Sequence, residues 1–142
     1  MAWGRVLLLV ALVLGRPIAG IDDLDAAAQA LRALGAPAAL LKGGHLPGDE
    51  VVDVLALADG SLAHLRSPRI ATTNGHGTGC TLSSAIAAHL ALGHALPSAV
   101  AQARSYILGA IQSGAAVRTG HGHGPLNHGY APVAQVVLPM FK

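Results

Sequence analysis

Apolar residues recur at intervals of three and four positions in three segments of the chain. These segments are residues 24–34 before Gly35, residues 78–92 before Gly93, and residues 97–113 before Gly114. This spacing puts the apolar side chains on one face of an α-helix, and glycine commonly ends a helix. Asp22 or Asp23 is placed to cap the first helix, and Pro97 opens the third at a position that proline favours. The pattern predicts three amphipathic helices.

Shorter apolar runs outside these helices indicate strands. Residues 38–41 predict a short buried strand. Residues 51–57 and 62–65 flank the turn residues 59–60, an arrangement that is typical of a β-hairpin. The valines of residues 131–142 predict a final strand. Strands mixed with helices in this way indicate a domain of the α/β class.

The beginning of the chain has a different character. Arg5 precedes nine consecutive apolar residues, Val6 to Leu14, a run too short to span a bilayer as a helix. Two interpretations remain open: a secretory signal peptide that ends near Gly20, or a hydrophobic N-terminus that an altered start or reading frame created. We favour the second and divide the chain into an atypical N-terminus, residues 1–14, and a domain that comprises residues 15–142.

The composition is that of one globular domain. The chain has 142 residues, of which 52% are hydrophobic and 11% charged, and this excludes a disordered protein. Aromatic residues make up only 3%, and the net charge is +2 with scattered basic residues, so neither a nucleic-acid partner nor a membrane partner is expected. The single cysteine excludes an intrachain disulfide and fits a reducing cytoplasm.

The most distinctive stretch is residues 72–84, which run directly into the second predicted helix. Gly75, Gly77 and Gly79 allow backbone conformations closed to other residues and let a ligand approach the main chain. The first N–H groups of a helix have no internal partner, and the helix dipole adds positive charge there. Such an arrangement favours phosphate, or the charge that develops in phosphoryl transfer. Cys80 lies at the same helix start, which favours the thiolate form of a cysteine.

The glycine spacing alone leaves two interpretations of this stretch open. A glycine-rich turn before a helix is often only a tight connection. The stretch is not a Walker A loop, because no lysine follows the last glycine, and its spacing differs from the dinucleotide-binding fingerprint. Cys80 also has two interpretations, as a catalytic base or as a small buried residue.

Three motifs follow one another along the chain. They are Leu41-Lys42-Gly43-Gly44-His45-Leu46, then His76-Gly77-Thr78-Gly79-Cys80-Thr81-Leu82-Ser83-Ser84-Ala85-Ile86, and then Gly122-His123-Gly124-Pro125-Leu126-Asn127-His128. Together they resemble the hydroxymethylpyrimidine/phosphomethylpyrimidine kinases, thiamine-biosynthesis enzymes of the ribokinase-like superfamily. The resemblance covers roughly residues 14–130. It implies the C-terminal half of a three-layer α/β/α ribokinase-like fold.

The resemblance also implies phosphorylation, with ATP as donor, of 4-amino-5-hydroxymethyl-2-methylpyrimidine or its monophosphate. Gly77, Thr78 and Gly79 would donate N–H groups to the transferring phosphoryl group. Cys80 would take the proton of the substrate hydroxyl, at the position where most ribokinase-like enzymes have an aspartate. His76 would lie on the substrate side, where it orients the site.

On the nucleotide side, the resemblance implies that Lys42 neutralises phosphate charge. Lys42, Gly43 and Gly44 directly follow the predicted strand of residues 38–41. They would therefore lie at its carboxyl end, the edge at which open α/β sheets bind ligands. The hydroxyl of Thr78 would face the same nucleotide.

One departure from the family pattern concerns magnesium, the counter-ion that the resemblance implies. In the family an Asn-x-x-Glu sequence helps to organise the magnesium–phosphate site. A rough alignment places its asparagine near Val6 and its glutamate near Leu9, so neither residue is present. We therefore expect negligible kinase activity from this chain alone. The alternative to a kinase function is that the chain is a catalytically inactive fragment, or an interaction module that retains the fold of the nucleotide side.

The histidines suggest a third and weaker alternative, a His-rich metal-binding protein. His121, His123 and His128, together with Cys80, are ligand types that zinc accepts, but their spacing is not that of a structural zinc module. We therefore assign no metal ligands. The resemblance instead implies that this loop and His45 support the nucleotide and anion-binding region. The expected partners are a small pyrimidine and ATP, and a homo-oligomer is compatible with the sequence.

Overall fold

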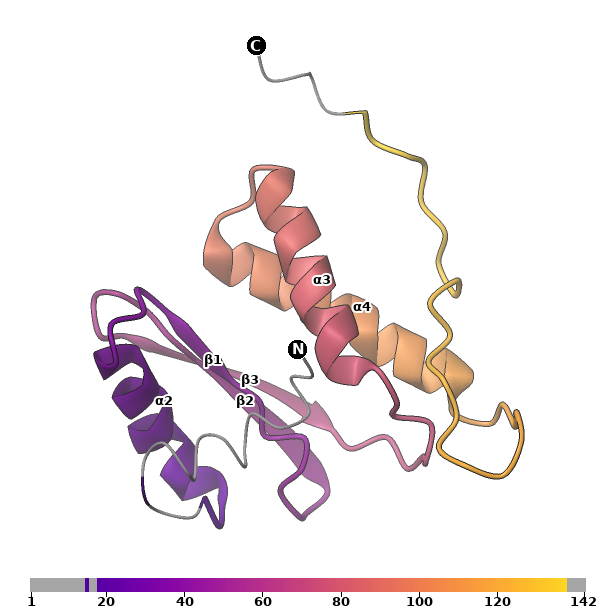
Figure 1. Cartoon of the computed structure of the whole chain (residues 1–142), viewed down its shortest axis with the longest axis horizontal. Coiled ribbons are helices and arrows are strands. Elements are labelled where there is room, and N and C mark those ends of the chain that lie inside the picture. Colours follow the sequence, from indigo (N-terminus) through magenta and orange to yellow (C-terminus); the bar gives the residue numbers. More distant parts are fainter. Residues whose placement is uncertain (1–14, 16–17, 138–142) are drawn as a thin grey trace. The chain divides into compact units, whose positions relative to one another are not determined.

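The computed structural model describes residue 15 and residues 18–137, so the apolar run of residues 6–14 lies outside the described part. The contacts within the chain divide it into two compact units, Met1–Arg69 and Ile70–Lys142. Figure 1 labels the helices and strands of both units. No change in composition marks this boundary in the sequence.

The first unit combines a helix with a three-stranded antiparallel sheet. A 3-10 turn, η2 (Ile21–Asp23), leads into α2 (Leu24–Ala33), and the strands are β1 (Ala39–Leu41), β2 (Glu50–Ala56) and β3 (Leu62–Pro68). The strand order is β1-β2-β3, with β2 in the centre. The predicted helix, first strand and hairpin are confirmed, although β3 extends to Pro68.

The core of this unit forms where α2 packs on the sheet. Leu24, Ala27 and Ala28 of the helix are fully buried against the strands. Val52 and Val54 lie two positions apart on β2, so both point to the helix side, as strand geometry requires. Apolar periodicity in the sequence therefore corresponds directly to this interface.

The expected aspartate cap has a different role. Asp23 stands at the N-cap of α2, but its side chain makes no hydrogen bond to the first turn of that helix. Its carboxylate accepts the N–H groups of Ala19, at 2.9 Å, and Gly20 instead. Asp23 thus stabilises η2, the turn that precedes the helix.

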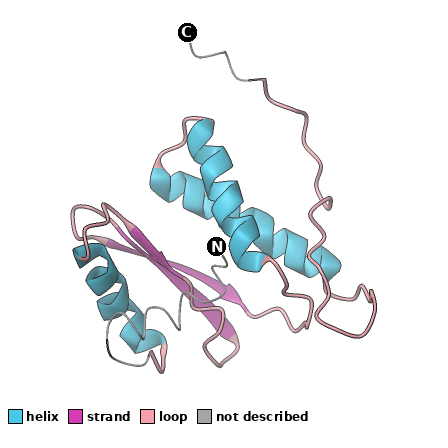
Figure 2. Cartoon of the chain, in the orientation of Figure 1, coloured by secondary structure: helices cyan, strands magenta, loops and turns pink. Residues whose placement is uncertain are grey.

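The second unit contains two helices that pack against each other, α3 (Thr78–Ala91) and α4 (Leu96–Gly114) (Figure 2). Both were predicted, and α4 has proline in its first turn as expected. Its buried face includes Val100, Ala103 and Ile107. None of the helices in the described part of the chain has the length and apolar character that a bilayer crossing requires.

The prediction of a final strand is wrong for the residues that the structure describes. Residues 131–137 form neither helix nor strand, and the side chains of Val133 and Val137 are 91% and 85% exposed. Pro132 has no amide donor, and the described part of this unit contains no strand with which the segment could pair. Residues 138–142 lie outside the described part.

Candidate functional site

The glycine-rich stretch forms the loop that leads into α3. Gly77 is the N-cap and has φ +86° and ψ 2°, a left-handed conformation in which other residues are strained. The N–H of Thr81 donates to the carbonyl of Gly77 at 2.9 Å. Residues 78–80 therefore form the first turn of the helix, where amide groups lack helical acceptors; the N–H of Thr78 makes a long hydrogen bond of 3.4 Å to the carbonyl of Gly75 in the preceding loop. This is the predicted turn followed by a helix, and convergence of these amides on one anion remains a prediction.

Cys80 is exposed, which contradicts its interpretation as a buried residue. It lines a hollow of about 340 Å³ together with Thr81, Ser84, Ala85, Tyr106 and His128. The imidazole Nε2 of His128 lies 2.9 Å from the hydroxyl of Thr81, and the Tyr106 hydroxyl donates to the His128 carbonyl at 2.8 Å. The end of the third motif therefore lies beside the presumed base; sequence reasoning placed this loop near the anion-binding region but did not predict the contact between His128 and Thr81.

Asn74 links the glycine loop to the segment after α4. Its side chain is almost fully buried, and its amide nitrogen donates to the carbonyls of Gly114, at 2.8 Å, and Val117. Its side-chain oxygen accepts the N–H of Gly124 at 3.1 Å. The sequence analysis gave Asn74 no role, although an asparagine directly before a glycine run was a signal for one.

The second and third motifs also meet through their backbones. His76 and Pro125 form a parallel β-bridge, and the N–H of His76 donates to the carbonyl of Gly124 at 3.4 Å. The N–H of Asn127 donates to the carbonyl of Ala110 in α4 at 3.0 Å. The expectation that the His/Gly loop packs beside the anion-binding loop agrees with this geometry.

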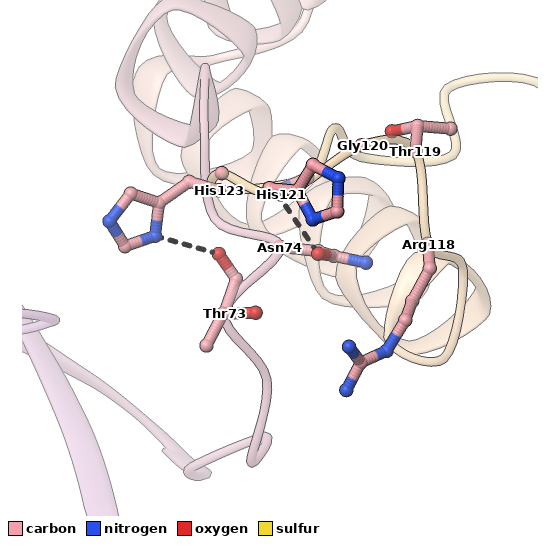
Figure 3. A pocket seen from close by; sticks show the side chains of 9 residues that line it. Thr73, Asn74, Arg118, Thr119, Gly120, His121 and His123 are labelled. Carbon is pink, nitrogen blue, oxygen red and sulfur yellow. Dashed lines mark hydrogen bonds between the residues drawn. The ribbon is translucent and has the colours of Figure 1, made fainter.

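A second hollow, of about 400 Å³, lies between these loops (Figure 3). Its lining residues are Thr73, Asn74, Arg118, Thr119, Gly120, His121, Gly122, His123 and Gly124. The Nδ1 atom of His123 lies 3.1 Å from the carbonyl of Thr73. Within the described residues, no three His, Cys, Asp or Glu side chains are grouped so that they could hold a metal ion.

The first motif belongs to the first unit, where Lys42 directly follows β1. The N–H of Gly43 donates to the buried carboxylate of Asp53 at 3.0 Å. A Cβ atom at Gly43 would lie 2.1 Å from the carbonyl oxygen of Val52, so only glycine fits there. Sequence reasoning missed Asp53, although a single charged residue inside an apolar strand was a signal for it.

Arg69 also contacts the loop after Lys42. Its guanidinium donates to the carbonyls of Gly44, at 2.9 Å, of Leu46 and of Gly48. Nothing in the local sequence pattern indicated this contact, because Arg69 follows β3 and lies more than twenty positions from its acceptors.

The family model and the relatives found by sequence agree on one family. A family model described as phosphomethylpyrimidine kinase matches residues 9–127. A hydroxymethylpyrimidine/phosphomethylpyrimidine kinase of Rhizobium meliloti is 48% identical over 120 residues, which are 83% of this chain and 44% of that protein. The enzyme of the same name from Streptomyces coelicolor is 51% identical over 110 residues, 77% of this chain and 39% of its own length. The chain thus spans about two fifths of these relatives.

Among solved structures, the chain is similar to a pyridoxal kinase of Bacillus subtilis in an ADP complex. The TM-score is 0.80 at 32% sequence identity, and the match covers 87% of this chain and 48% of that one. This likeness places the chain in the ribokinase-like fold.

Proposed function

The chain belongs to the phosphomethylpyrimidine kinase family, and we propose that it carries phosphoryl-transfer residues of an enzyme in thiamine biosynthesis. The substrate would be 4-amino-5-hydroxymethyl-2-methylpyrimidine or its monophosphate, with ATP as the donor. One observation carries this proposal: the loop that ends at left-handed Gly77 and places residues 78–80 in the first turn of α3.

The anion-binding part of the proposal rests on this helix start. Phosphoryl transfer depends mainly on positioning and on stabilising charge that spreads over the phosphoryl oxygens. The amides of Gly77, Thr78 and Gly79 would donate to those oxygens, and the dipole of α3 favours negative charge at the same place. ATP, when bound, supplies the γ-phosphoryl group.

Cys80 is the proposed general base. Its exposure makes the thiol accessible to a substrate, as a base must be. As the hydroxymethyl oxygen attacks phosphorus, its proton passes to the thiolate of Cys80, and the bond between the γ-phosphorus and the bridging oxygen breaks to leave ADP. His76 would orient the substrate from the neighbouring loop.

The nucleotide side is assigned to the first motif. Lys42 would neutralise phosphate charge, while Gly43 and Gly44 allow the backbone to approach the nucleotide. The rough alignment places Val6 and Leu9 near the positions of the family's Asn-x-x-Glu, and neither can bind a cation. We therefore assign no residue to Mg²⁺, which would enter only as the counter-ion of ATP.

The test uses the 142-residue chain and a chimera. In the chimera, residues 15–127 of this chain replace the corresponding segment of the Rhizobium meliloti relative, which keeps its own residues at the positions of Val6 and Leu9. We expect the chimera to phosphorylate hydroxymethylpyrimidine, and Cys80→Ala to lower its turnover by about a hundredfold or more. The chain alone should remain near background, because its residues 6 and 9 lack the acidic motif. Chromatographic detection of the phosphorylated pyrimidine gives the rates.

Ser98→Ala is the control, because this serine is exposed at the start of α4 and its hydroxyl accepts a hydrogen bond from Gln102 of the same helix at 3.0 Å. It should leave turnover unchanged. Pyridoxal is tested in parallel, since a pyridoxal kinase is a structural neighbour. The proposed function is contradicted if a folded chimera phosphorylates neither hydroxymethylpyrimidine nor its monophosphate, or if it prefers pyridoxal to both.

A further inference from the structure

The loop of residues 43–49 is held by two charged side chains for which the proposed mechanism has no use. The guanidinium of Arg69 donates hydrogen bonds to the carbonyls of Gly44, Leu46 and Gly48. The carboxylate of Asp53 accepts the N–H of Gly43 at 3.0 Å. Both ends of the loop are therefore fixed by one side chain from β2 and one from the residue that follows β3.

This arrangement fixes one conformation of an otherwise permissive segment. Asp53 is only 5% exposed, and a buried carboxylate is costly unless it is hydrogen-bonded. The guanidinium presents its donors in a rigid planar fork, so one side chain fixes three peptide planes at once. Flexible glycines alone would leave the loop free to adopt many conformations.

The three carbonyl contacts also determine where the loop amides point. In a trans peptide the C=O and the following N–H point in opposite directions, and the described residues contain no cis peptide. The carbonyl of Gly44 faces Arg69, so the N–H of His45 points away from the guanidinium. The carbonyl of Gly48 also faces Arg69, so the N–H of Asp49 points away from the guanidinium as well. Two amide donors are thus turned to the side opposite Arg69, in the loop that directly follows Lys42.

We propose that Arg69 is a positioning residue for nucleotide binding. By holding the loop carbonyls on one side, it presents the amide of His45 on the other, where this amide and the ammonium of Lys42 bind phosphate oxygens of ATP. This inference rests on the proposed function, because it takes ATP as the ligand. Arg69 itself does not contact the nucleotide.

The experiment compares the 142-residue chain with Arg69→Lys and Arg69→Met. Lysine keeps the charge but loses the planar fork, so both variants should release the loop. Hydrogen exchange of peptides that cover residues 43–49 should become about tenfold faster, with exchange elsewhere unchanged. In titrations with ATP followed by NMR, the Kd should rise about tenfold, as expected for the loss of a preorganised binding loop.

Arg66 supplies the matched control. It lies on β3, three positions before Arg69, and its guanidinium bonds the half-exposed carboxylate of Glu50 at 2.7 Å. Arg66→Lys and Arg66→Met should change neither loop exchange nor the Kd for ATP. This pair separates the role of Arg69 from a general effect of removing an arginine from this unit.

Each other result has a defined meaning. If the wild-type chain does not bind ATP, this inference is overturned, whereas the proposed function is decided separately by the turnover of the chimera. If it binds ATP and the Arg69 variants bind equally well, only the inference is overturned. If exchange rises throughout the first unit, Arg69 supports folding rather than the loop, and the inference is again overturned. Arg69→Lys keeps the test valid if Arg69→Met does not fold.

Discussion

The side-chain oxygen of Asn74 accepts the backbone N–H of Gly124 at 3.1 Å, and a Cβ atom at Gly124 would lie 2.1 Å from that same oxygen. Asn74 lies just before the second motif and Gly124 belongs to the third, and α3 and α4 lie between them in the sequence. Their contact is so close that a side chain at position 124 is incompatible with it. The pair therefore fixes the position of the His/Gly loop relative to the loop that precedes α3.

The first prediction concerns this close approach. Gly124→Ala should destabilise the second unit by about 1–3 kcal/mol, because the added methyl group forces Asn74 or the loop to move. Gly122→Ala is the control, since nothing lies within 4 Å of a Cβ atom there. Denaturant unfolding of both variants measures the difference. Equal denaturation midpoints for the two variants would show that the loop can move to accommodate the methyl group without loss of stability, and would contradict the prediction.

The second prediction concerns the amide group of Asn74. Asn74→Asp keeps the shape of the side chain but sets a carboxylate oxygen against the carbonyls of Gly114 and Val117. We expect a loss of about 2–4 kcal/mol, since buried donors disappear and their acceptors stay unpaired. Asn127→Asp, at an exposed position, should cost little. Thermal unfolding followed by circular dichroism gives the comparison.

The third prediction concerns the turn between β2 and β3. The side-chain hydroxyl of Ser61, and then its backbone N–H, donate to the carboxylate of Asp59 and hold the pKa of Asp59 below its usual value. A lowered pKa stabilises the fold at pH above the unfolded value, and this contribution is lost as pH falls through the folded value. Ser61→Ala should raise the pKa of Asp59 toward 3.8 in an NMR titration. An unchanged pKa would contradict the assigned cause.

The sequence predicted the helices and strands better than it predicted the hydrogen bonds between distant segments. The helices and the hairpin were predictable because local apolar periodicity determines which face is buried. The contacts of Asn74, Asp53 and Arg69 were not, because each joins a side chain to the backbone of a segment distant in the sequence. Such bonds leave no repeating pattern.

In the candidate site, too, the local features were predicted from the sequence and the long-range contacts were not. Gly77 and the start of α3 were predicted from glycine spacing and helix rules, and the structure has them in those positions. The proximity of His128 to Thr81 was not predicted, because it depends on how the segment after α4 returns to α3. Among the described residues the final strand was mispredicted, because its valines indicated strand propensity but the described part of the second unit contains no strand to pair with it.

The last prediction separates the base role of Cys80 from a binding role. Hydroxymethylpyrimidine must lose a hydroxyl proton as it attacks phosphorus, and a general base contributes about a hundredfold or more to such a step. The monophosphate attacks through a phosphate oxygen, which is already largely deprotonated at neutral pH because its second pKa is near 6. In the chimera, Cys80→Ala should therefore reduce kcat/KM for hydroxymethylpyrimidine by about a hundredfold or more, but for the monophosphate by less than about tenfold. Cys80→Asp should recover part of the first activity, because a carboxylate at this position can also accept the proton. Steady-state kinetics with both substrates at pH 7–8 give these ratios. Equal losses with both substrates would show that Cys80 binds or orients the phosphoryl group and is not the base.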